Sequence, residues 1–238
     1  MAAAVELRRR ATAEAVGTAL LLATVVGSGI MGDRLSGGNV AVALLANSLA
    51  TGAGLVALIS TFGPISGAHF NPVVTLADAA QGGVAWRDVP VYVGAQVAGA
   101  FGGVAVAHVM FGEALFTPSR HAREGAAQLV GELVATFGLL SVIAGCARHR
   151  ASTVPFAVAA YITGAYWFTS STSFANPAVA LARGFTDTFA GIRPADVPAF
   201  VVAELVGAAL AVLLSRWLLG VQAADAPSVA GQAPGGQS

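Results

Sequence analysis

Six long apolar segments, separated by short polar stretches, dominate the pattern of residues along the chain. They cover roughly residues 11–32, 40–62, 89–111, 126–146, 153–170 and 198–219. A helix that crosses a bilayer needs about 20 predominantly apolar residues. The pattern therefore predicts an all-α membrane protein with six transmembrane helices.

Two shorter apolar pieces begin at Pro72 and Pro177, and each runs for only two or three helical turns. Polar residues then appear, at Asp78 in the first piece and at Arg183 in the second. Proline is favoured in the first turn of a helix, where its missing N–H has no partner to lose. Each piece is therefore predicted to be a re-entrant half-helix that starts inside the membrane.

Four short motifs recur in the same order in the two halves of the chain. Residues 13–18 match 131–136, 51–53 match 163–165, 96–100 match 204–208, and 71–72 match 176–177. Each half has three crossings, an odd number, so the second half enters the membrane from the opposite side, which makes an inverted repeat. We expect one membrane domain over residues 1–220, with repeats at about 10–111 and 126–219, and a disordered tail over 221–238.

Composition narrows the class of protein further. The chain is 56% hydrophobic and only 10% charged, with a mean hydropathy of +0.74, whereas a soluble domain is about 25% charged. A net charge of zero argues against a nucleic-acid partner. The single Cys146 excludes an internal disulfide. Neither a metal-ligand cluster nor a nucleophile–base pair stands out, so we expect no cofactor, no metal and no enzymatic activity.

Basic residues indicate an orientation in the membrane. Arg8, Arg9 and Arg10 precede the first apolar segment, which is too long for a cleavable signal peptide. Cytoplasmic loops carry an excess of basic residues. With a cytoplasmic N-terminus, seven of the twelve arginines fall inside and five outside, so the N-terminal cluster carries most of the argument. Both termini are predicted to be cytoplasmic.

The paired Asn-Pro motifs, Asn71-Pro72-Val73 and Asn176-Pro177-Ala178, predict a pore. One Asn-Pro alone is ordinarily a turn or a helix start, but here two stand at equivalent places in an inverted repeat. Two half-helices would meet head to head, each with roughly half a positive charge at its N-terminus. That arrangement repels cations, hydronium included. The irregular segments before them, 67–70 and 173–175, are tolerated at membrane depth only when buried or lining a wet cavity.

The stretch 66–75, Ser-Gly-Ala-His-Phe-Asn-Pro-Val-Val-Thr, resembles a signature of the aquaporin and aquaglyceroporin superfamily. The resemblance covers about residues 10–220. It implies one pore per chain, a homotetramer in the lipid bilayer, and passive, bidirectional transport of small neutral solutes. It also implies that Glu14 and Glu132 brace the two re-entrant loops from inside apolar helices, and that His69 is a loop-bracing residue rather than a metal ligand.

The same resemblance carries the four positions of the family's selectivity filter onto Thr51, Gly164, Ser173 and Val179. Family members keep an Arg and one or two aromatic residues there, and this chain has neither at these positions. We therefore expect a filter that is wider and repels cations more weakly, with a cargo of polyol size. Arg183 lies one helical turn beyond Val179. It either reaches the vestibule and partly replaces the missing Arg, or is a snorkelling helix end at the membrane interface.

The small filter and the run 176–192 resemble a bacterial subgroup of aquaglyceroporins that is associated with arsenic resistance and lacks the filter Arg. That subgroup implies the bacterial inner membrane and a cargo of arsenous acid or related arsenicals beside glycerol and water. Two alternatives stay open. One is an ordinary water and glycerol facilitator. The other is an ion-coupled secondary transporter, against which no intramembrane carboxylate is left once Glu14 and Glu132 brace loops.

Overall fold

The computed structural model describes residues 5–220, so the predicted disordered tail, 221–238, lies outside the described residues. Within that range the protein is helical and has no strand. The helices are α1 (Leu7–Leu35), α2 (Val40–Ser66), α3 (Pro72–Ala80), α4 (Val89–Phe111), α5 (Ala126–His149), α6 (Val154–Phe168), α7 (Pro177–Arg183) and α8 (Val197–Leu219). Single 3₁₀ turns, η1 (Ala151–Thr153) and η2 (Pro194–Asp196), precede α6 and α8.

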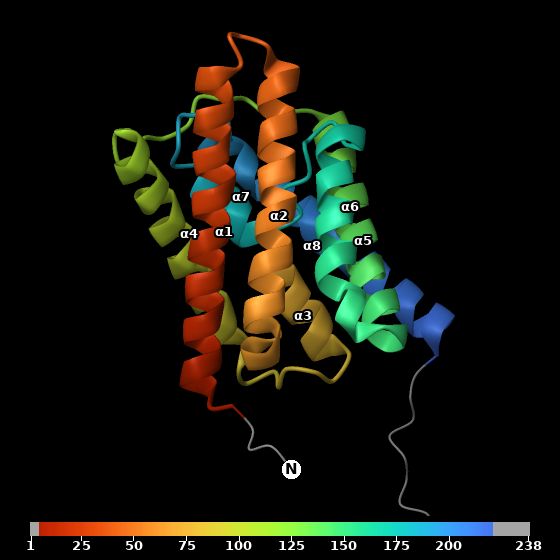
Figure 1. Ribbon diagram of the computed structural model, residues 1–238. Coiled ribbons are helices and arrows are strands. Elements are labelled where there is room, and N and C mark those ends of the chain that lie inside the picture. The colour runs from red at the N-terminus through yellow and green to blue at the C-terminus, as the bar shows by residue number, and fades with distance from the viewer. Residues whose placement is uncertain (1–4, 221–238) are drawn as a thin grey trace, which may run out of the picture.

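The two halves of the chain have equivalent packing. In the first half α1 packs against α2 and α4, and in the second half α5 packs against α6 and α8. The two halves join where α2 packs on α6 and where the short helices α3 and α7 meet. Figure 1 shows the long helices as a bundle, with α3 in its lower half and α7 in its upper half. The predicted fold, with two half-helices in an inverted repeat, is confirmed.

The helices are long enough to cross a membrane, except for α6, which is shorter than the sequence predicted. Among the described residues, five helices (α1, α2, α4, α5 and α8) are long and apolar enough to cross a bilayer. The predicted fifth crossing, 153–170, holds only the 15-residue α6, about 22 Å long at 1.5 Å per residue. It stops at Phe168 because Thr169 turns to an extended conformation, with φ −105° and ψ 140°. The chain from Thr169 onward then leads back to α7 as irregular backbone.

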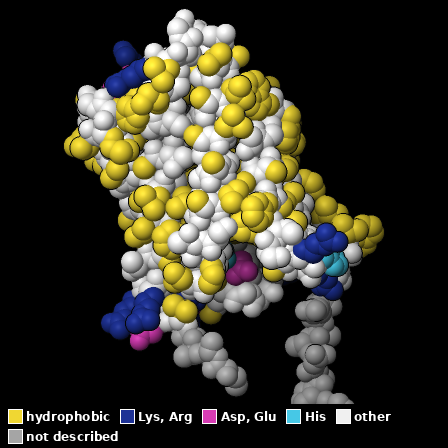
Figure 2. Space-filling view, in the orientation of Figure 1, with side chains coloured by type: hydrophobic (Ala, Val, Ile, Leu, Met, Phe, Trp, Pro, Cys, Tyr) yellow, Lys and Arg dark blue, Asp and Glu magenta, His cyan; other side chains and the backbone are white. Residues whose placement is uncertain are grey.

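The outer surface is apolar around the middle of the bundle. Large side chains on several helices are exposed, such as Leu49 on α2, Val109 on α4 and Leu213 on α8. Figure 2 shows hydrophobic side chains over the flank of the bundle and arginines only towards its two ends. Apolar exposure on this scale fits contact with lipid rather than water.

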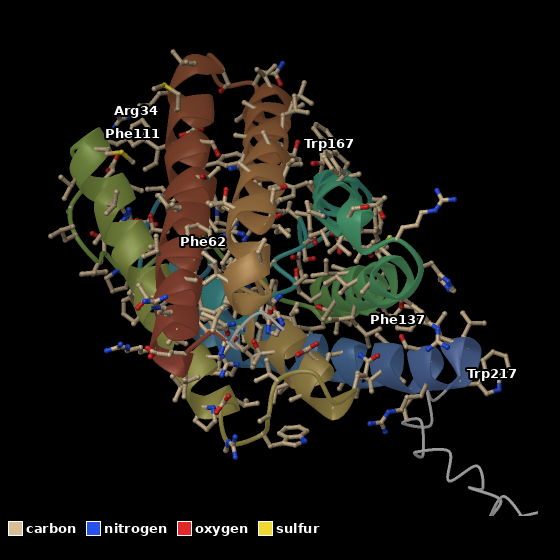
Figure 3. The ribbon with its side chains drawn as sticks, turned by 60° about the horizontal axis from the view of Figure 1, so that its bottom comes forward. Arg34, Phe62, Phe111, Phe137, Trp167 and Trp217 are labelled. Atoms are coloured by element: carbon tan, nitrogen blue, oxygen red, sulfur yellow. The ribbon has the colours of Figure 1, made fainter. Side chains whose placement is uncertain are left out.

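Both ends of the bundle carry residues suited to the membrane interface. Trp167 and Trp217 are exposed near the ends of α6 and α8, where tryptophan is enriched in membrane proteins. Figure 3 also shows Arg34 beside Phe111. The Arg34 guanidinium lies 5.5 Å from the Phe111 ring centroid and donates to the Phe111 carbonyl oxygen at 2.8 Å. This contact joins the end of α1 to the end of α4.

Candidate functional site

The two Asn-Pro motifs meet at the centre of the protein and bind each other's loops. The Asn71 side-chain amide donates to the Ala175 carbonyl at 2.7 Å, and the Asn176 amide donates to the Phe70 carbonyl at 2.8 Å. Each Asn also caps its own half-helix through Oδ1, which accepts from the backbone N–H two residues on at 3.0 Å. A carboxamide has two N–H donors, so each Asn keeps one for a solute in the cavity that both residues line.

The backbone that leads into each motif is strained in the same way. Ala68 and Phe70 have φ of 50° and 51°, and Ser173 and Ala175 have φ of 55° and 48°. Left-handed conformations are uncommon for residues other than glycine and cost free energy. The strained residues stand three and one positions before the Asn in both halves. Such loops keep their shape only when surrounding groups hold them.

Glu14 holds the first loop. This α1 residue is fully buried, and its carboxylate accepts from the Ser66 hydroxyl at 2.6 Å and from the N–H groups of His69 and Phe70 at 2.9 and 2.6 Å. Gln96 of α4 donates to it at 2.8 Å. Four donors surround the carboxylate, which offsets the cost of burying its charge.

Two carboxylates hold the second loop. Glu132 accepts from the N–H groups of Phe174 and Ala175 at 2.8 and 2.7 Å, and Glu204 of α8 accepts from the Asn176 N–H at 2.9 Å. No role was predicted for Glu204 from the sequence, although its alignment with Gln96 in the repeat was a usable signal. The statement that only Glu14 and Glu132 are intramembrane carboxylates was therefore wrong, because Glu204 is also fully buried.

The His69 ring packs against α3. Its Nδ1 lies 3.1 Å from the Thr75 hydroxyl, and its Nε2 lies 3.8 Å from an Asp78 carboxylate oxygen. The ring also lines the central cavity. Within residues 5–220, no group of three or more His, Cys, Asp or Glu side chains could hold a metal ion. These contacts fit a ring that fixes the loop to the half-helix.

A cavity of about 1220 Å³ runs through the protein past both asparagines. Its wall comes from α1, α2, α3, α5, α6, α7, the end of α8 and the two re-entrant loops. None of the carboxylates Glu14, Glu132 and Glu204 is among the described residues that line it. The acids therefore lie behind the wall, where they contact backbone and not solute.

Three of the four expected filter residues line this cavity, and one does not. Thr51, Ser173 and Val179 line it. Gly164 is on the outer face of α6: it is exposed, is not among the described lining residues, and a Cβ added there would meet nothing within 4 Å. The assignment of Gly164 to the filter was wrong in this structure, because α6 turns a different face to the cavity.

Tyr166 occupies the wall where Gly164 was expected. The face of α6 that lines the cavity carries Val158, Ile162 and Tyr166, which are spaced four residues apart. Tyr166 is 3% exposed, and its hydroxyl lies 3.1 Å from the Thr51 hydroxyl. The wall therefore contains an aromatic ring after all, and the opening is narrower than four small residues would leave it. The helical spacing from Val158 could have identified it.

Arg183 lies inside the protein and is only 2% exposed. Its Nε donates to the Ala190 carbonyl, and its guanidinium carbon lies 3.4 Å from the centroid of the Phe174 ring. The interpretation of Arg183 as a snorkelling helix end at the interface was therefore wrong. Its side chain lines the large cavity and also a second, smaller one.

Comparisons with known proteins agree on one family. A family model described as "Major intrinsic protein" matches residues 1–169. "Aquaglyceroporin AqpS" of Rhizobium meliloti (strain 1021) is 56% identical over 90% of this chain and 91% of its own length. "Probable aquaporin NIP7-1" of Arabidopsis thaliana is 41% identical over 42% of this chain and 35% of its own. The structure of the aquaglyceroporin from Plasmodium falciparum superposes with a TM-score of 0.70 at 21% identity, covering 90% of this chain and 98% of that one.

Proposed function

This chain belongs to the major intrinsic protein family, and we propose that it conducts small uncharged solutes passively across a membrane. Proteins of this family are multi-pass membrane channels and not enzymes. The proposed cargo is glycerol-like polyols and arsenous acid, with or without water. The observation that carries the proposal is a cavity that passes two facing half-helix N-termini and then a wall of Thr51, Tyr166, Ser173 and Val179 without an arginine among these four.

The facing half-helices support exclusion of cations. Asn71 and Asn176 sit at the N-termini of α3 and α7, where peptide dipoles place partial positive charge. A cation here would also lose water of hydration without replacement, because the one free amide N–H of each Asn is a donor and cannot coordinate a cation. A neutral hydroxylated molecule is not repelled by the helix dipoles, and its oxygen can accept a hydrogen bond from that N–H in place of one from water.

The wall beyond the asparagines suits a polyol. Hydroxyl groups come from Thr51, Tyr166 and Ser173, and apolar surface comes from Val179 and the Tyr166 ring. The buried Ser173 hydroxyl has no hydrogen-bond partner within residues 5–220, so a hydroxylated solute would supply one. Glycerol offers oxygens along one side and C–H groups along the other, and arsenous acid is a neutral trihydroxy species of similar shape. These are the properties on which the cargo is proposed.

Two other functions make different use of the same cavity. An ordinary water and glycerol facilitator would discriminate by size. The Tyr166 ring is consistent with this function, because it makes the opening narrower than the sequence predicted. An ion-coupled transporter needs a titratable or ion-binding group in the solute path. Glu14, Glu132 and Glu204 all lie behind the wall. Asp78 does line the cavity, but its carboxylate accepts from the Val84 N–H at 2.7 Å, at the end of α3 and away from the asparagines. The passive channel is therefore the better supported function.

The proposal is tested by flux measurements on protein reconstituted in vesicles. Water, glycerol and undissociated arsenous acid are compared for the wild type, Val179→Arg and Val179→Met, where Met adds bulk without charge. We expect Val179→Arg to reduce glycerol and arsenous acid flux at least tenfold and water flux far less, and Val179→Met to have the smaller effect. Equal loss of all three fluxes, or no loss, would contradict the proposal.

The assembly and orientation of the channel are also proposals. The described residues begin and end at the same end of the bundle (Figure 1), and the arginines at positions 8–10 lie there. This supports cytoplasmic termini in the inner membrane of a bacterium. Residues 1–220 would form one channel domain, and four chains would assemble as a homotetramer with one pore in each.

A further inference from the structure

A second cavity, of about 250 Å³, lies at the end of the bundle opposite the described termini. We call it the vestibule. Its wall includes Asn47 of α2, His121 and Arg123 of the α4–α5 connection, Gln128 of α5, and Arg183. We propose that the vestibule binds a small, singly charged oxyacid that still carries an O–H group, held by Arg183 and Arg123. This goes beyond the proposed function, which concerns neutral solutes.

The first argument is that two buried arginines share this wall without a carboxylate partner. Arg183 and Arg123 are 2% and 9% exposed. Arg123 donates to the carbonyls of Gly191 and Ser171 at 2.9 and 3.0 Å, and Arg183 donates through Nε to that of Ala190. The Nη groups of Arg183 form no hydrogen bond within residues 5–220. Buried charges are normally paired, but neither guanidinium forms an ion pair within residues 5–220. Glu132 and Glu204 act on them electrostatically, but these carboxylates accept from backbone N–H groups of the second loop.

The second argument is that the two positive charges lie close together. Both guanidinium groups approach the ring of Phe174, at 3.4 Å for Arg183 and 4.9 Å for Arg123. Contact with an aromatic face stabilises each cation to some extent. Burial lowers the pKa of Arg123 to about 10, so Arg123 still carries its charge at neutral pH. An anion between them would relieve their mutual repulsion.

The third argument is that the acids near the vestibule are engaged elsewhere. Asp187 accepts from the Arg120 backbone and side chain at 2.9 and 2.8 Å. Asp196 pairs with Arg193 at 2.7 Å and also accepts from the Arg123 backbone N–H, not from its guanidinium. Burial and the charges of Arg123 and Arg183 lower the pKa of His121. The field in the vestibule is therefore positive, as required for an anion site.

Gln128 narrows the class of anion. Its Nε2 donates to the Ser170 carbonyl at 2.9 Å, while its buried Oε1 has no hydrogen-bond partner within residues 5–220. An orphan acceptor next to two cationic donors fits a ligand that has both charged oxygens and an O–H. Dihydrogen phosphate has this character and sulfate does not. A volume of 250 Å³ equals that of about eight waters at roughly 30 Å³ each, so such an ion fits.

The test is calorimetric titration of inorganic phosphate and sulfate into the purified protein in detergent. At pH 6, where dihydrogen phosphate predominates, we expect one phosphate site per chain, with Arg183→Gln weakening it at least tenfold. Arg120→Gln is the matched control, because Arg120 is exposed at the same end and paired with Asp187. It should leave the affinity unchanged. Gln128→Leu should weaken phosphate binding more than sulfate binding.

Several outcomes would overturn the inference. They are the absence of phosphate binding to the wild type at millimolar concentration, equal binding by Arg183→Gln, or an equal loss in Arg120→Gln, which would indicate adventitious surface binding. If Arg183→Gln does not fold, Arg183→Lys replaces it: Lys keeps the charge but has fewer donors, so this variant should bind phosphate more weakly than the wild type, and equal binding would overturn the inference. Binding in detergent is measured without flux, so its failure leaves the channel proposal standing.

Discussion

At the scale of single residues, Tyr166 sets the size of the opening and Gly164 does not. The hydrogen bond between the Tyr166 and Thr51 hydroxyls, 3.1 Å long, ties the ring on α6 to α2 across the wall of the cavity. A ring held in this way has one orientation, so the width that it leaves for a solute is fixed. Gly164 is only two residues earlier, but on a helix that spacing places it on the opposite face.

Substitutions of Tyr166 and Gly164 test which of the two residues limits the width of the opening. Tyr166→Ala should raise the flux of polyols larger than glycerol several-fold and that of glycerol by less, because the ring no longer limits width. Tyr166→Phe keeps the ring but loses the contact with the Thr51 hydroxyl, and should keep most of the size limit. Gly164→Ala should change nothing, since its new methyl group meets no atom within 4 Å. Vesicle swelling in a series of polyols measures all three, and an altered size limit in Gly164→Ala would restore the original filter assignment.

At the scale of elements, the half-helices depend on buried side chains of the long helices. α1 contributes Glu14, α5 contributes Glu132, and α4 and α8 contribute Gln96 and Glu204 at equivalent places in the repeat. The first loop thus has one acid and one amide, and the second has two acids. Asn176, which starts α7, receives its backbone contact from Glu204. The position of α7, and of Val179 on it, therefore rests on α8.

The repeat predicts which change at Glu204 is tolerated. Glu204→Gln keeps an oxygen acceptor for the Asn176 N–H, as Gln96 provides an amide in the first half, and should leave folding and glycerol flux nearly unchanged. Glu204→Leu leaves that N–H unpaired and should cost about 1–3 kcal/mol of stability. Thermal unfolding in detergent and glycerol flux measure both variants. If Glu204→Leu melted like the wild type, Glu204 would have no part in holding the loop.

At the scale of the whole molecule, the sequence predicted the architecture well and the wall of the pore less well. Long apolar runs and the prolines at 72 and 177 locate helices because these signals are local. The faces of α6, the burial of Arg183 and the contact of Glu204 depend on what lies across the bundle. Gly164 was misplaced because a count along the chain ignores that α6 ends at Phe168 and irregular backbone follows. Such facts follow only from packing.

The central claim is that solute crosses this molecule passively, through a cavity that the buried acids Glu14, Glu132 and Glu204 do not line and in which Asp78 is bound to the backbone at the end of α3. The most direct measurement is glycerol flux into vesicles over a wide range of gradients, with and without an imposed proton or sodium gradient. We predict a rate linear in the glycerol gradient, equal in both directions and indifferent to either ion gradient, with no proton leak. Flux that saturates and follows an ion gradient would contradict the channel and support a coupled transporter.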